Sequence, residues 1–170
     1  NGSPVAFSRK VSLRGIGHNT RSIVDGYIHN QLAHADLADE RYRTSLQNQS
    51  FTNPAVRLAD PFETSSGCYW YNLHIALVTS DRWRMDGATA GKIGVACREM
   101  DSHMQTAKLS VMPDHMHIAV KANPEFSPSQ VAARLQEVTA RAVGMLGLWK
   151  DTFYVGTFGE YSMAAVRNRN

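Results

Sequence analysis

The sequence predicts an α+β fold, in which one antiparallel sheet carries helices on one face and the elements follow in the order β-α-β-β-α-β. Three observations lead to this prediction. Residues 69–79 are rich in aromatic and branched side chains, which favour strands. Residues 108–121 hold two short apolar segments around a proline turn, and residues 127–130 are of the types that begin a helix.

The first half of this unit is a strand over 69–79 followed by a helix over 87–104. In the second segment apolar residues recur at three- and four-residue steps from Ile93 to Met104, which indicates an amphipathic helix. Gly91 and Gly94 weaken its helical propensity.

The next two elements are strands over 108–111 and 115–121, which we expect to form a hairpin. Met112-Pro113-Asp114 turns the chain between them, because proline has no N–H to donate within a central strand.

A second helix begins at Ser127-Pro128-Ser129-Gln130, where the serine caps the helix, proline opens it and glutamine completes a capping box. Its apolar stripe runs over 131–146, and Gly147 is the expected C-cap. A fourth strand over 152–158 and a terminal helix over 162–170 follow. This order is that of ferredoxin-like folds.

Residues 1–66 differ in character, so we divide the chain into an N-terminal extension (1–66) and a domain (67–170). Loosely spaced apolar residues over 20–46 predict one or two helices, and residues 47–67 are typical of an irregular connector. The sequence leaves the role of the extension open between a packing arm, a specificity module and a dimer contact.

The composition restricts which kinds of protein the chain can be. The net charge of +3 permits a polyanionic partner without requiring one. No apolar run is long enough for a membrane span, and no secretory signal begins the chain. Two cysteines, Cys68 and Cys97, fit a reducing compartment and are too few for a disulfide scaffold. We therefore expect a cytoplasmic protein with no membrane partner.

His115-Met116-His117 is the most informative motif. Residues two apart on a strand share a face, so both imidazoles point one way while Met116 and Ile118 point the other. Two protonated imidazoles would repel each other, and a metal ion that holds them neutral removes this repulsion. The helix-free face of the sheet would carry this pair. His74 is a third ligand if its strand is adjacent, although a structural role is commoner for a lone histidine.

Other families with paired histidines can be separated by spacing. Ala119 breaks the His-x-His-x-His pattern of histidine-triad hydrolases, and no His-x-Ser/Thr or His-Glu-x-x-His motif occurs. The remaining pattern is His-hydrophobe-His.

The segment from Met112 to Val120 resembles the signature of single-tyrosine HUH transposases, the insertion-sequence-200-like (IS200-like) group. The segments His74–Arg82, Ser127–Ser129 and Phe153–Gly159 are similar to other parts of that family, in the same order. The resemblance covers about 68–169.

The resemblance implies a metal-dependent DNA strand transferase. His115 and His117 would bind Mg²⁺ or Mn²⁺, and a tyrosine on the terminal helix would attack a phosphate of single-stranded or hairpin DNA to give a 5′-phosphotyrosine. Family members are homodimers, and a glutamine four residues after the tyrosine is their third metal ligand.

The chain departs from the family near its end. Counting from Gly159 places the tyrosine position at Arg169, or at Asn168 with a one-residue slip, and the glutamine position at about 173. Tyr161 is the candidate substitute nucleophile. Two hypotheses remain open beside an active enzyme: a catalytically inactive remnant or domesticated nucleic-acid-binding regulator, and, ranked last, a ferredoxin-like RNA binder.

Basic residues are the candidate phosphate contacts. Five of them are expected to flank the histidine face: Arg82, Arg84, Lys121, Arg167 and Arg169. A sixth, Arg134, lies on one stripe of the second helix. Trp83 is a candidate for stacking on an unpaired base.

Overall fold

The computed structural model describes residues 10–34 and 39–167. Its centre is a five-stranded antiparallel sheet with the order β2-β6-β7-β5-β8. The strands are β2 (Phe51–Thr52), β5 (Asn72–Thr79), β6 (Met104–Val111), β7 (His115–Ala122) and β8 (Trp149–Phe158). The first strand of the β-α-β-β-α-β unit lies between the third and the fourth, and the α+β fold class is confirmed.

A smaller sheet is formed by three strands that come before β5 in the chain. It contains β1 (Val11–Arg14), β4 (Gly67–Trp70) and β3 (Phe62–Thr64), in the order β1-β4-β3. The single strand predicted over 69–79 is therefore two strands, because β4 pairs in the small sheet and β5 pairs in the large one. The predicted irregular connector likewise contains the two short strands β2 and β3.

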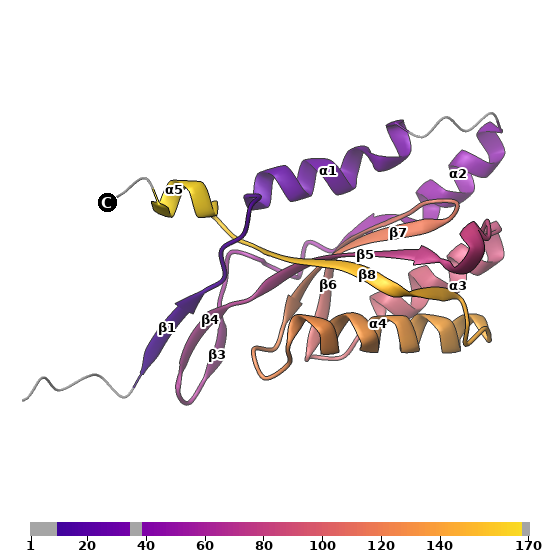
Figure 1. Ribbon diagram of the computed structural model, residues 1–170. Helices are drawn as coiled ribbons and strands as arrows, with labels where there is room; N and C mark the ends of the chain where they lie inside the picture. Colours follow the sequence, from indigo (N-terminus) through magenta and orange to yellow (C-terminus); the bar gives the residue numbers. More distant parts are fainter. Residues whose placement is uncertain (1–9, 35–38, 168–170) are drawn as a thin grey trace, which may run out of the picture.

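Helices α3 (Gly87–Arg98) and α4 (Pro128–Val143) lie side by side under one face of the large sheet (Figure 1). Buried residues of both helices pack against Met116 and Ile118 of β7, as the alternation in the sequence predicts. The capping box at Ser127 is present. Helix α2 (Glu40–Gln49) packs beside α3 and contributes Leu46 to the same core.

Two predicted helix ends were wrong. Helix α3 ends at Arg98, before Met104, because Met104 already belongs to β6 and pairs with Ala122. Helix α4 ends at Gly144 rather than Gly147, since Gly144 has the left-handed backbone conformation of a C-cap, with φ of 80°.

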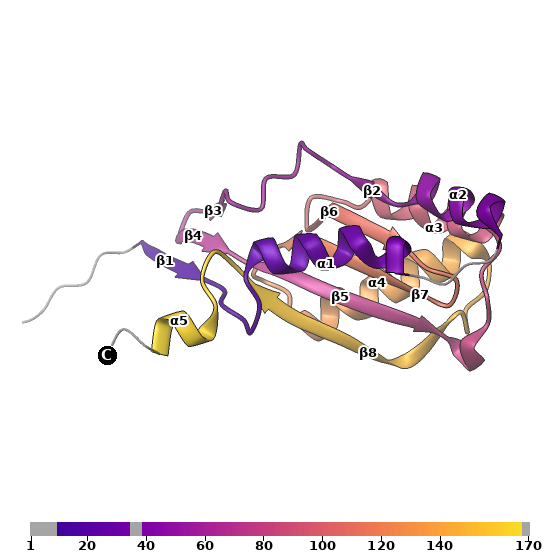
Figure 2. The ribbon, with the colours of Figure 1, turned by 90° about the horizontal axis from the view of Figure 1, so that it is seen from above.

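The prediction that the other face of the sheet is free was also wrong. Helix α1 (Arg21–His34) lies across that face in both views (Figures 1 and 2). Val24 and Ile28 are buried against Ala119 and Phe158, so α1 is packed onto the sheet by an apolar contact. The one or two helices predicted over 20–46 are α1 and α2.

The last helix, α5 (Met163–Arg167), lies beyond one end of the large sheet (Figure 2). The predicted terminal helix extends to residues 168–170, which are outside the described residues. Within the described ranges, none of the helices has the length and apolar character needed to cross a membrane.

Candidate functional site

The register of the sheet gathers three histidines and a tyrosine on the face under α1. His117 pairs with Ala76 of β5, and His115 pairs with Val78. Tyr154 of β8 also pairs with Ala76, and His74 lies two residues before Ala76 on the same face. The rings of His115 and His117 have centroids 5.1 Å apart, and those of His74 and His117 lie 5.4 Å apart.

His74 and His117 are held together by a hydrogen bond. Nε2 of His74 lies 3.2 Å from Nδ1 of His117, and each residue is only 7% exposed. Burial lowers the pKa of His74 to about 4. Burial, with the charges of His74 and His115, lowers the pKa of His117 to about 3. Both rings are therefore neutral at physiological pH, the state in which an imidazole binds a metal.

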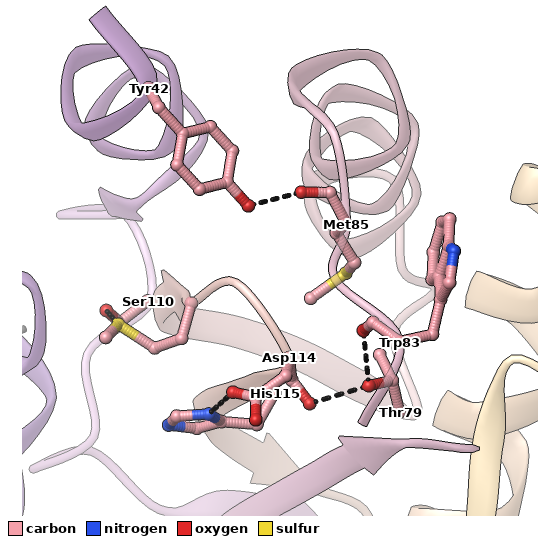
Figure 3. A network of polar contacts seen from close by, with 8 residues as sticks. Tyr42, Thr79, Trp83, Met85, Ser110, Asp114 and His115 are labelled. Carbon is pink, nitrogen blue, oxygen red and sulfur yellow. Dashed lines mark hydrogen bonds and ion pairs between the residues drawn. The ribbon is translucent and has the colours of Figure 1, made fainter. Parts of the chain in front are cut away.

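His115 is oriented by the turn before it. Its Nδ1 lies 2.7 Å from a carboxylate oxygen of Asp114 (Figure 3). The backbone of this turn is fixed to the end of β5, because the N–H of Thr79 donates to the carbonyl of Asp114 at 2.8 Å. The hydroxyl of Thr79 lies 3.0 Å from the same carbonyl. A histidine bonded to a carboxylate through one nitrogen is a common arrangement in metal sites.

The donor set fits a divalent ion bound by the two histidines of the motif. Each Nδ1 is engaged, by Asp114 for His115 and by His74 for His117, which leaves Nε2 of each ring as the nitrogen available to a metal. Among the described residues, no three or more His, Cys, Asp or Glu side chains form a metal cluster.

Helix α1 brings a tyrosine to the histidines. The ring of Tyr27 meets the rings of His117 and His74 edge-on, with centroids 5.1 Å and 5.8 Å away. Tyr27 is 49% exposed, so solvent and a ligand can reach it.

Gln31 follows one turn later on the same side of α1. Helix α1 runs from the Asn72 end of β5 towards the Val78 end (Figure 2), which is also the direction from His117 to His115. Four helical residues advance about 6 Å, and two strand residues about 6.6 Å. The spacing from Tyr27 to Gln31 therefore matches the spacing from His117 to His115.

The sequence reasoning missed these two residues. Residues 27–31 have the Tyr-x-x-x-Gln spacing of the family's terminal helix, but they lie in the extension and not after Gly159. The structure also places the start of α1 next to Gly159, since the N–H of Arg21 donates to the carbonyl of Gly159 at 2.7 Å and Thr20 pairs in parallel with that glycine.

Tyr161 does not lie at the histidines of its own chain. It follows the end of β8, where Phe158 pairs with Asn72. Asn72 and Ala76, the partner of His117, are four strand residues apart, which corresponds to about 13 Å. Tyr161 is 49% exposed and lies between this end of β8 and α5.

The candidate phosphate contacts are dispersed. Arg84 follows the end of β5 and interacts with the hydroxyl of Tyr42. The pKa of Tyr42 is raised, because the effect of burial outweighs the opposing effect of this arginine. Lys121 is on the histidine face of β7 but at its far end, opposite Asn72. Arg134 is on α4, under the opposite face, and forms an ion pair with Asp101.

The other three basic candidates are Arg82, Arg167 and Arg169. Arg82 ends the 3₁₀ helix η1 (Ser80–Arg82), but its side chain is outside the described part of the structure. Arg167 is exposed at the end of α5. Arg169 lies outside the described residues.

A comparison with protein families finds a match over residues 68–168, to the family described as transposase, IS200-like. The chain belongs to the IS200-like transposase family. The match spans more than half of this transposase-family chain and contains the whole His115–His117 strand. It begins after α1, so Tyr27 and Gln31 lie outside the matched part.

Among solved structures, the chain is similar to a candidate transposase from Deinococcus radiodurans R1. The two are 20% identical with a TM-score of 0.49, over 63% of this chain and 94% of that chain. A search of curated proteins found no match to this transposase-family chain.

Proposed function

We propose that the protein binds single-stranded or hairpin DNA and cleaves and transfers a strand through a phosphotyrosine intermediate. The observation that carries this proposal is the contact of Tyr27 with His117, on the face that also holds His115. This contact brings a hydroxyl group that can act as a nucleophile next to two imidazoles that can bind a metal. The proposed reaction needs both groups.

His115 and His117 would hold Mg²⁺ or Mn²⁺, with the side-chain oxygen of Gln31 as the candidate third protein ligand. A bound divalent ion would polarise the scissile phosphate and offset its developing charge. Two imidazoles leave room for oxygen ligands, which hard ions such as Mg²⁺ prefer.

Tyr27 is the proposed nucleophile. Its phenolic oxygen attacks phosphorus, the bond from phosphorus to the 3′ oxygen breaks, and the 5′ phosphate remains on the tyrosine. The phenolic proton passes to solvent, and the departing 3′ oxygen takes up a proton to become a hydroxyl. Strand transfer reverses this exchange with a new 3′ hydroxyl.

His74 and Asp114 are positioning residues in this proposal. For Nε2 of His117 to keep its lone pair, Nδ1–H must donate to Nε2 of His74. Asp114 acts in the same way on Nδ1 of His115.

An inactive DNA-binding protein is the second candidate. The burial of His117 under α1 favours it, because a substrate phosphate must reach a residue that is only 7% exposed. In this alternative the histidine face would be a structural part of a nucleic-acid-binding surface.

Cleavage of a labelled single-stranded hairpin library in Mn²⁺ separates the two. The enzyme proposal expects cut products that end in a 3′ hydroxyl, and their loss in a His115→Ala, His117→Ala variant that still binds the library. Library binding without cleavage by the wild-type protein would favour the inactive alternative.

A further inference from the structure

A cavity of about 460 Å³ opens beside Tyr27 on the histidine face. Its walls come from α1 on one side and from β5, β7 and β8 on the other. They include Ile23, Tyr27, His74, Ala76, His117 and Tyr154. This volume is in the range of small-molecule sites, so the cavity can accept a group of that size.

The lining chemistry favours a flat, uncharged ring over a phosphate. No Lys, Arg, Asp or Glu is among the described residues that line the cavity. Aromatic and aliphatic groups make most of its surface, and Asn19 adds one carboxamide, which both donates and accepts hydrogen bonds. The described lining offers a phosphate no positively charged side chain, whereas an aromatic ring with polar edges would meet stacking partners and a hydrogen-bonding group.

Tyr154 provides an aromatic surface at the mouth of this cavity. Its side chain is 52% exposed, and its ring meets that of His74 with centroids 5.4 Å apart. The hydroxyl end lies over Gly156, where an added Cβ would be only 2.6 Å from the phenolic oxygen. The absence of a side chain at residue 156 thus lets the tyrosine lie along β8 with a ring face available.

We propose that this cavity holds an unpaired nucleobase of single-stranded DNA, next to the phosphate that Tyr27 attacks. This inference rests on the proposed function and adds a substrate-binding site to it. The base stacks on Tyr154, packs against Ile23, and presents a polar edge to Asn19. Because most of these contacts do not depend on base identity, the site accepts several bases.

The test compares two oligomers with the same number of phosphates: a short oligothymidylate and an abasic oligomer of equal length. Binding is measured by fluorescence anisotropy in the Tyr27→Phe background, so that cleavage does not interfere. We expect a preference for oligothymidylate that Tyr154→Ala reduces by about tenfold, a typical effect of losing one stacked base. Tyr154→Phe should keep the preference, because it keeps the ring.

Two further variants separate the cavity from general effects. Gly156→Ala should weaken the preference by displacing Tyr154, while Tyr161→Ala removes a similarly exposed tyrosine outside the cavity and should leave it unchanged. A full preference in Tyr154→Ala would overturn the inference, as would equal binding of both oligomers by the Tyr27→Phe protein. If that protein bound neither these oligomers nor the hairpin library, the proposed DNA function itself would be refuted.

Discussion

The ring of Tyr27 on α1 meets the ring of His117 on β7 edge-on, with centroids 5.1 Å apart. This contact joins the N-terminal extension to the strand that carries the family motif. It depends on the packing of Val24 and Ile28, which fixes α1 on the sheet.

Ile28→Ala should destabilise the protein by about 2–5 kcal/mol, because it removes a buried side chain and leaves a cavity between α1 and the sheet. Urea unfolding measures this as a lower midpoint. Ile23→Ala is the matched control, since Ile23 is on the same helix but more than half exposed, and it should shift the free energy of unfolding far less. Equal effects of the two variants would show that α1 is not packed as described.

Gln31→Ala should weaken Mn²⁺ binding in calorimetry by about tenfold or more, because it removes the proposed third protein ligand. Gln31→Glu keeps an oxygen at the same place and should retain binding. Gln47→Ala, an exposed glutamine on α2, serves as the control. Unchanged Mn²⁺ affinity in Gln31→Ala would exclude the residue from the metal site.

Asp114→Asn should also weaken Mn²⁺ binding, by about 10- to 100-fold, because the carboxylate orients His115 through Nδ1. The fold should persist, since the backbone carbonyl of residue 114 and its bond to Thr79 remain. Circular dichroism and calorimetry on the same preparation check both parts. A variant with wild-type affinity would show that the contact does not tune the site.

Stability of the metal-free protein should fall as the pH is lowered from about 6.5 to about 4. Folding lowers the pKa of His74 to about 4 and that of His117 to about 3, from 6.5. In this window the unfolded chain binds protons that the folded chain does not, so the free energy of unfolding is greatest above the window and decreases as the pH falls through it. The loss is on the order of 3 kcal/mol for each buried histidine.

Urea unfolding at a series of pH values measures this dependence. His74→Gln should make it shallower, because one of the two groups is gone, while His18→Gln changes an exposed histidine and should preserve the slope. A stability that stays constant between pH 6.5 and pH 4 would contradict the burial of the pair.

Much of the fold was predictable because local patterns specify it. The capping box at Ser127 and the apolar alternation around His117 predicted α4, β7 and the face on which the histidines lie. The motif also led to the family. These signals are short-range, so a single sequence contains them in full.

The placement of α1 was not predictable in the same way. Its apolar residues serve two surfaces, since Ile23, Val24 and Tyr27 line the cavity while Val24 and Ile28 are also buried against the sheet. Its position depends on contacts with β7 and β8, far away in the sequence. Tyr27 and Gln31 lie in the extension, outside the part of the chain that resembles the family, so the sequence favoured Tyr161 as the nucleophile.

The central claim is that Tyr27 forms the covalent bond to DNA. The protein is incubated with the cleaved hairpin DNA and Mn²⁺, digested with a protease and a nuclease, and its peptides are analysed by mass spectrometry. We predict a nucleotide adduct on the peptide that contains Tyr27, lost in Tyr27→Phe and retained in Tyr161→Phe and Tyr154→Phe. An adduct on Tyr161 or Tyr154, or cleavage that persists in Tyr27→Phe, would contradict the account.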